Sequence, residues 1–141
     1  MHSINPYINF NGNCEEAFNF YKKVFGREFL SISRFKDAPA GASPVSKDQG
    51  DLILHVALPL GKSNILMGSD CPGEWGKVSA GTNMHISLHP ETEKEAETIF
   101  HALSVGGKVS VPLQKMFWNA YFGMVTDPFG VQWMVNYDYG K

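Results

Sequence analysis

The sequence predicts an α+β fold made of two βαβββ modules that follow one another along the chain. Each half of the 141 residues shows the patterns of a strand, a helix and three further strands, in that order. A Glu-Ala pair near the helix start at 16–17 recurs at 95–96. One helix and four strands are too few to bury both faces of a sheet. The modules must therefore pack together, or against another chain, to make a stable core.

The first module begins with alternating residues of a strand at 4–10 and an Asn11-Gly12 turn. Asn13 and Glu16 predict a capping box for a helix at 14–25, and Gly26 predicts its end. Strands are expected at 28–35, 51–60 and 64–68, a mobile loop at 37–50 and a linker at 70–81. The helix should bury one apolar stripe, formed by Ala17, Phe20, Tyr21, Val24 and Phe25.

The second module repeats this order, with a strand at 82–89 and a Thr92–Glu95 capping box that starts a helix. The helix should end at Gly106-Gly107 and bury a stripe formed by Ala96, Ile99, Phe100 and Leu103. The remaining strands are expected at 108–113, 120–126 and 131–137. Asp-Pro-x-Gly at 127–130 is turn chemistry, because proline presets φ and glycine accepts positive φ.

Composition indicates a single globular domain at 1–141, with module one at about 1–74 and module two at about 80–141. Hydrophobic residues make up 43% of the chain and charged residues only 18%, enough apolar surface for a core. The net charge of −2 and the lack of a basic stripe argue against nucleic acid as a partner. The apolar runs are shorter than the about 20 residues of a membrane helix, and the N-terminus shows no signal pattern. We expect a cytoplasmic protein with no membrane partner.

Four stretches resemble one known family: 5–17 (NPYINFNGNCEEA), 20–26 (FYKKVFG), 85–88 (HISL) and 127–136 (DPFGVQWMVN). They are similar to the vicinal oxygen chelate superfamily, which includes glyoxalase I, extradiol dioxygenases and bleomycin- and fosfomycin-resistance proteins. Within it, the chain resembles the PhnB-like branch. The resemblance implies curved mixed sheets forming a cavity, with the helices on the outer face, and a homodimer.

The resemblance also implies where a divalent metal would bind, because the family's ligands come from the first, fourth, fifth and eighth strands. The fifth-strand histidine matches His85, but the eighth-strand carboxylate position falls on Met134. The first-strand position falls among Asn5, Pro6 and Tyr7, and the fourth-strand position on Leu66 or Met67. Thioethers suit soft Cu(I) rather than the divalent ions of this superfamily. We therefore predict no metal site of the usual kind and no cofactor.

A small-molecule site remains the expectation, and its predicted lining is Tyr7, Asn9, His55, Met67, His85, Ser87, Trp118, Gln132 and Met134. His85 is either a ligand or general base, or a pocket residue bonded to a neighbouring strand. Two histidines in one pocket, His55 and His85, would favour proton-transfer chemistry. Trp133 and Val135 should face the helix, opposite Gln132 and Met134.

The aromatic cluster at 117–122 either stacks on a flat ligand or packs in the core or a dimer contact. Cys14, at a helix start, is either a thiol with a lowered pKa or a small buried residue, and the second reading is preferred. Cys71, in the linker, is expected to be exposed. The 37–50 loop is either a lid or a slack connection.

These observations predict a small-molecule-binding protein, or a metal-independent enzyme, with an unknown small molecule as partner. One alternative is a metal-dependent lyase or transferase of the glyoxalase or thiol-transferase type, with an unconventional site that includes His85 and His55. Another is a drug-sequestering resistance protein. No glycine-rich loop suits an adenosyl cofactor, so we expect no methyltransferase activity.

Overall fold

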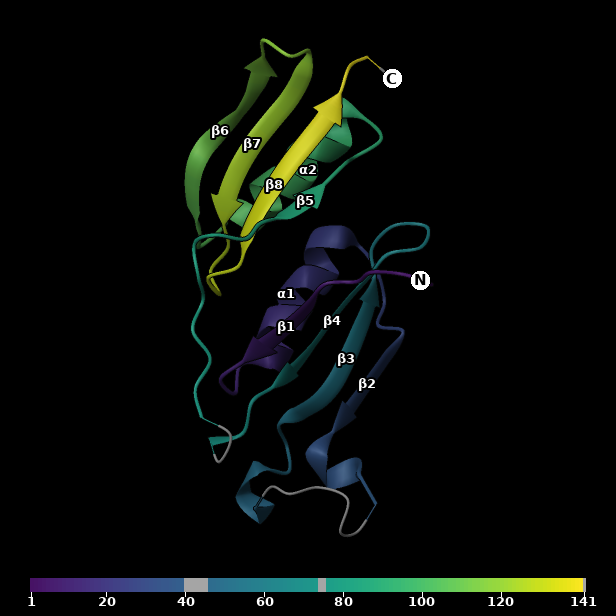
Figure 1. Ribbon diagram of the computed structural model, residues 1–141, viewed down its shortest axis with the longest axis vertical. Coiled ribbons are helices and arrows are strands. Elements are labelled where there is room, and N and C mark those ends of the chain that lie inside the picture. The colour runs from purple at the N-terminus through teal and green to yellow at the C-terminus, as the bar shows by residue number, and fades with distance from the viewer. Residues whose placement is uncertain (40–45, 74–75, 141) are drawn as a thin grey trace. The chain divides into compact units, whose positions relative to one another are not determined.

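The computed structural model describes residues 1–39, 46–73 and 76–140, and the chain forms two compact units, Met1–Ser79 and Ala80–Lys141 (Figure 1). The first unit contains β1 (Tyr7–Phe10), α1 (Cys14–Phe25), β2 (Ser31–Arg34), β3 (Ile53–Pro59) and β4 (Ile65–Asp70). The second contains β5 (Ile86–Leu88), α2 (Glu93–Ser104), β6 (Lys108–Met116), β7 (Ala120–Thr126) and β8 (Gln132–Asp138). The predicted α+β class, with two βαβββ modules, is confirmed.

Each unit has its own four-stranded mixed sheet, with strand order β1-β4-β3-β2 in sheet A and β5-β8-β7-β6 in sheet B. The first and last strands of each unit are parallel neighbours, and the other neighbouring strands are antiparallel. One helix lies against one face of each sheet (Figure 1). We call the face turned away from the helix the open face.

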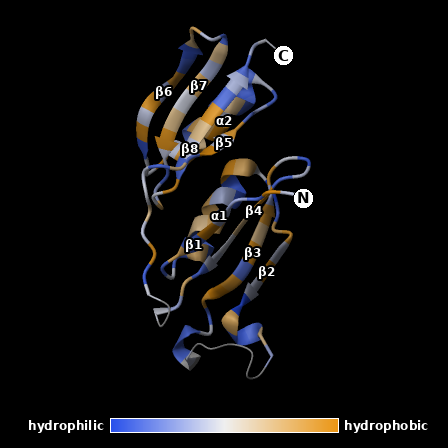
Figure 2. Cartoon of the chain, viewed as in Figure 1, coloured by the Kyte–Doolittle hydropathy of each residue, from blue (hydrophilic) through white to orange (hydrophobic). Residues whose placement is uncertain are grey.

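Alternation along the strands separates the core from the open faces, and Figure 2 shows it as colour changes along β6 and β7. Under α1, the buried residues include Val56, Leu58 and Leu66. Under α2 they include Trp133 and Val135, the two residues of β8 that were predicted to face the helix.

The buried stripe of α1 differs from the prediction at three phenylalanines. Phe18 is fully buried, whereas Phe20 and Phe25 are only half-buried. The reason is Gly68 on β4, because a Cβ there would lie 2.6 Å from the Phe18 ring. A glycine in the sheet therefore makes the space that the Phe18 side chain fills. In α2 the predicted stripe is buried except for Ile99, which is half-buried.

The predicted capping box of α1 is wrong. Asn13 makes no side-chain cap hydrogen bond. Instead, Oδ1 of Asp70 accepts hydrogen bonds from the backbone N–H groups of Gly12 (3.0 Å) and Cys14 (2.9 Å). Asp70 was assigned to the linker, but it is the last residue of β4. The cap comes from a strand that lies far away in the sequence, so no local pattern could reveal it.

One of the two hydrogen bonds of the predicted Thr92–Glu95 capping box is present at the start of α2. Oγ1 of Thr92 accepts a hydrogen bond from the N–H of Glu95 at 3.0 Å. The Glu95 carboxylate reaches past Thr92 and accepts from the N–H of Glu91 at 2.8 Å. Gly26 ends α1 in the left-handed conformation, as predicted, with φ of 62°.

Strands β1, β2 and β5 are shorter than the strands predicted at 4–10, 28–35 and 82–89. Strand β6 is longer than predicted and runs to Met116. Residues 40–45 of the predicted mobile loop at 37–50 lie outside the described residues, and a 3₁₀ turn at Lys47–Gln49 lies within it. A second 3₁₀ turn, at Phe35–Asp37, replaces the end of the strand predicted at 28–35. In the part of the chain that the structure describes, no helix combines the length and hydropathy needed to cross a membrane.

Candidate functional site

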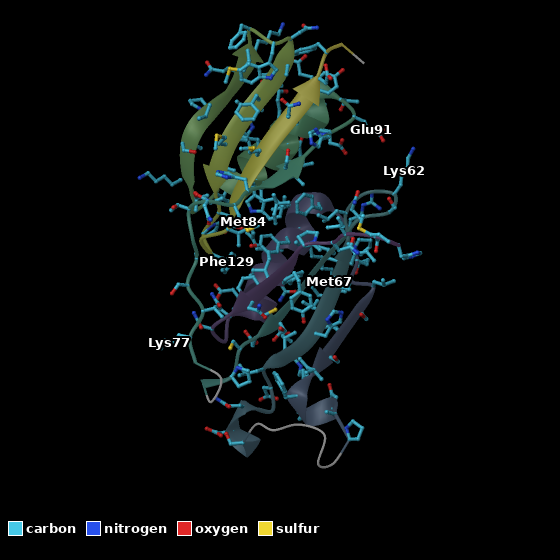
Figure 3. All side chains as sticks on the ribbon, in the orientation of Figure 1. Lys62, Met67, Lys77, Met84, Glu91 and Phe129 are labelled. Atoms are coloured by element: carbon cyan, nitrogen blue, oxygen red, sulfur yellow. The ribbon has the colours of Figure 1, made fainter. Side chains whose placement is uncertain are left out.

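The open face of sheet A carries a row of four residues, one from each strand. Tyr7 lies opposite Met67, Met67 opposite Ala57, and Ala57 opposite Ser31. Met67 is labelled on β4 in Figure 3. Leu66, the other candidate for the fourth-strand position, is fully buried on the helix side. The fourth-strand position on the open face is therefore occupied by the thioether of Met67.

A phenol and an imidazole meet on this face. The hydroxyl of Tyr7 lies 3.4 Å from Nδ1 of His55, and the two ring centroids are 5.8 Å apart. Tyr7 is 46% exposed. Which group donates depends on the His55 tautomer. Next to this pair, Oγ of Ser69 donates to Oδ1 of Asn9 at 3.2 Å. The predicted residues Tyr7, Asn9, His55 and Met67 thus share one face.

The open face of sheet B carries a second row. Ser87 on β5 lies opposite Met134 on β8, Met134 lies opposite Met124 on β7, and Met124 lies opposite Val111 on β6. Oγ of Ser87 is 3.2 Å from Nε2 of His89, which places the imidazole beside this row. Thioethers therefore lie at the middle of the open face, where the eighth-strand position of the resemblance falls.

The neighbouring rows of sheet B are polar and aromatic. Phe122 lies between Gln114 and Asn136, and Gln132 lies opposite Thr126. The amide of Gln132 donates from Nε2 to the carbonyl oxygen of Met84 at 2.7 Å, which holds the segment just before β5. Met84 is labelled in Figure 3. His85 follows directly, is half-buried, and by alternation lies on the same face as Ser87.

Trp118 lies in the β6–β7 turn, where Asn119 has a left-handed φ of 64°. Its ring centroid is 5.6 Å from that of Phe122 and 4.9 Å from that of Phe117. Phe122 is paired with Asn136 on β8. His85 precedes Ile86, which is paired with Trp133, so His85 lies beside Gln132, which is on the same strand as Asn136. Four residues of strand, about 13 Å, separate these two levels. The structure therefore places Trp118 and His85 at different ends of the open face.

Sheet B thus carries Ser87, Gln132 and Met134 on its open face, with His85 at one end and Trp118 at the other. Among the residues that the structure describes, no three His, Cys, Asp or Glu side chains are grouped so that they could hold a metal ion. Sequence reasoning missed Met124 and His89. Alternation along β7, which aligns Phe122 with Met124, was the available signal for the first of these.

The Cys14 thiol is not activated. Cys14 is completely buried, and burial, with smaller contributions from Asp70 and Glu15, raises the pKa of its thiol above the ordinary range. Helix position alone would have lowered that pKa, but burial dominates. Cys71 is half-buried rather than exposed, and its Sγ lies 3.5 Å from the carbonyl oxygen of Gly76.

Comparisons with known proteins give the family. The model of the Glyoxalase/Bleomycin resistance protein/Dioxygenase superfamily matches residues 3–135. Protein YjdN of Escherichia coli is 31% identical over 140 residues, which cover 94% of this chain and 93% of YjdN. The crystal structure of PA1353 from Pseudomonas aeruginosa has 40% identity and a TM-score of 0.83, covering 96% of this chain and 97% of that one.

A second solved structure comes from Bacillus cereus and is described as a PhnB protein and putative 3-demethylubiquinone-9 3-methyltransferase. It has 27% identity and a TM-score of 0.70, covering 96% of this chain and 98% of the other. The family match, the YjdN likeness and the two βαβββ units agree. The chain belongs to the glyoxalase/bleomycin resistance protein/dioxygenase superfamily, and PhnB-like proteins are among its structural neighbours.

Proposed function

We propose that the chain binds an uncharged small molecule on its open faces, as a binding protein or as an enzyme that works without a divalent metal. The observation that carries this proposal is the chemistry of the rows through Met67, Met134 and Phe122. Their side chains are thioethers, hydroxyls, amides, two aromatic rings and small apolar groups. Apolar surface with a few fixed polar groups is typical of small-molecule sites.

The same rows disfavour the metal chemistry of better-known superfamily members. Methionine is a poor ligand for hard and borderline divalent ions. Met67 and Met134 occupy the open-face positions of β4 and β8, opposite Tyr7 and Ser87. A ligand here would be held by dispersion contacts and by hydrogen bonds to the Gln and Asn amides rather than by chelation.

If the chain is an enzyme, the Tyr7–His55 pair is the best candidate for proton transfer. A phenol and an imidazole in contact can pass a proton between them, and both lie on the face proposed to receive the ligand.

Metal analysis tests the absence of a divalent site. Protein purified without chelator should contain far less than one divalent ion per chain, and His85→Ala should leave that content unchanged. A stoichiometric divalent ion that is lost in His85→Ala would overturn the proposal in favour of a metal-dependent enzyme of the glyoxalase type.

Ligand binding is tested by thermal-shift screening of neutral, anionic and cationic aromatic compounds, because a ligand that binds only the folded state raises the unfolding temperature. We expect the strongest shifts from neutral compounds. Phe122→Ala should reduce those shifts, whereas the matched change Phe117→Ala, at a ring that is 96% exposed, should not. Hits confined to charged compounds, or equal losses in both variants, would contradict the proposal.

We also propose that two copies of the chain form a homodimer. Apolar side chains remain exposed on the edge of sheet A, where Leu30 and Ile32 lie, and on the corresponding edge of sheet B, where Val109 lies. These exposed apolar side chains on two sheet edges are the observation that supports the proposal. Light scattering after size exclusion should give twice the mass of one chain, and a mass of one chain at micromolar concentration would contradict the proposal.

A further inference from the structure

We propose that the open face of sheet B holds a site for a soft monovalent cation, Cu(I), formed by the thioethers of Met124 and Met134 and the imidazole of His89. The two methionines are directly opposite each other on the antiparallel strands β7 and β8, and both are half-buried. Opposite side chains on one face have Cβ atoms about 5 Å apart. Three rotatable bonds in each methionine let both sulfurs turn toward one ion.

The third ligand comes from the residue just after β5, the strand on the other side of Met134. Ser87 lies directly opposite Met134, and its Oγ is 3.2 Å from Nε2 of His89. This contact keeps the exposed imidazole beside Ser87, the residue opposite Met134, and in the proposed site its other ring nitrogen, Nδ1, is the ligand. A hydroxyl that orients a ligating imidazole through its other ring nitrogen is a common supporting arrangement at metal sites.

The chemistry of this cluster selects the ion. Two neutral thioethers and one neutral imidazole offer soft and borderline donors and no negative charge. Such a set suits Cu(I), whereas Mg²⁺, Mn²⁺ and Ca²⁺ require oxygen donors. The row through Met134 contains no carboxylate, since its members are Ser87, Met134, Met124 and Val111.

Sheet A provides an internal comparison. Met67 is also on an open face, but its neighbours across the strands are Tyr7 and Ala57, so a second thioether is missing from that row. Met67 therefore serves as a matched control for a methionine in a similar sheet position that lacks the partner.

Anaerobic titration of the full chain with Cu(I), in competition with the chromogenic chelator bicinchoninate, tests the site. We expect one tightly held Cu(I) per chain. Met124→Leu, Met134→Leu and His89→Gln should each weaken the affinity by about tenfold or more, in the range known for damage to metal sites. The nearly isosteric control Met67→Leu and the change His85→Gln should leave it unaltered.

Folding is checked separately by circular dichroism, so that a loss of Cu(I) affinity is not mistaken for unfolding. A second measurement uses Ag(I) and protein labelled with ¹³C at the methionine methyl groups. The Met124 and Met134 methyl signals should shift on addition of Ag(I), while the Met67 signal should stay in place.

Three results would overturn the proposal: Cu(I) binding that survives the Met124→Leu/Met134→Leu double change, an equal loss in Met67→Leu, or a loss in His85→Gln but not in His89→Gln. Zn²⁺ binding as tight as Cu(I) would also contradict a soft site. The proposed binding of a neutral small molecule does not depend on these outcomes, because its readout is the thermal shift of metal-free protein.

Discussion

Nε1 of Trp133 donates a hydrogen bond to Oδ2 of Asp127 at 2.9 Å, inside the buried end of the second unit. The other carboxylate oxygen of Asp127 accepts from the N–H groups of Phe129 (2.8 Å) and Val131 (3.0 Å). The acidic residue of the Asp-Pro-x-Gly turn therefore does more than favour a turn. It fixes the start of β8 and anchors the indole that fills the core under α2.

Replacing Asp127 with Ala should destabilise the protein by about 3 kcal/mol, because three hydrogen bonds to one buried carboxylate are lost and their donors are left unpaired. Urea unfolding followed by tryptophan fluorescence measures the change. Asp127→Asn is the control, because its side-chain oxygen can still accept from Phe129 and Val131, so its loss should be clearly smaller. Equal effects of the two variants would show that the backbone contacts contribute little.

The cap of α1 gives a second prediction, with Asp70 and Asn13 as the contrasting pair. Asp70 accepts from three backbone N–H groups, those of Gly12, Cys14 and Ile53. Asp70→Ala should cost about 3 kcal/mol in the free energy of unfolding, whereas Asn13→Ala should cost well under 1 kcal/mol. Chemical denaturation of both variants compares them. A larger effect at Asn13 would restore the local cap that the sequence suggested.

Two glycines should resist enlargement for the same physical reason. A Cβ at Gly68 would lie 2.6 Å from the Phe18 ring, and a Cβ at Gly123 would lie 2.6 Å from the Phe100 ring. Each glycine-to-alanine change should destabilise the protein by about 1–3 kcal/mol through overpacking. Gly26→Ala is the control, since a Cβ there meets no atom within 4 Å and only the left-handed φ opposes it. Thermal unfolding should rank Gly26→Ala as the mildest change.

The Cys14 thiol should make stability depend on alkaline pH. Burial raises the thiol pKa in the folded protein, whereas the unfolded chain releases this proton near pH 8.5. Above that pH the folded state holds more protons than the unfolded state. The free energy of unfolding must therefore fall as pH rises. Denaturation between about pH 7.5 and 10 should show this decline, and Cys14→Ala should flatten it.

A thiol reagent gives an independent check of Cys14. At neutral pH, dithionitrobenzoate should modify only Cys71 in the folded protein and both cysteines after denaturation. Rapid reaction of two thiols per folded chain would show that Cys14 is accessible, contrary to its complete burial.

Local patterns predicted the elements well and the contacts between them poorly. The bounds of α1 and β7 follow from residue periodicity and glycine stops, which act within a few residues. The Asp70 cap links residues 56 positions apart, so nothing near Cys14 could reveal it. Phe18 was missed for a similar reason, because its burial depends on Gly68 in another element.

In the candidate site, too, local patterns predicted the face of a strand but not its neighbours. Alternation placed Gln132 and Met134 on one face of β8, and the register confirms that face. Pairing register decides which residues are neighbours across strands, and register is a tertiary property. Met124 could join Met134 only after β7 and β8 were aligned, and the distance between Trp118 and His85 depended on the same alignment.

Each unit brings its own first and last strands together as neighbours, so all four strands of a unit find their ladder partners within one continuous stretch of chain, residues 1–79 or 80–141. A segment with this property can be copied in a gene without breaking a sheet. After duplication, mutations on the open face of one copy leave the backbone ladders of both intact. Ala57 beside Met67 in one unit, and Met124 beside Met134 in the other, show that the same place in two like-built units can carry different chemistry.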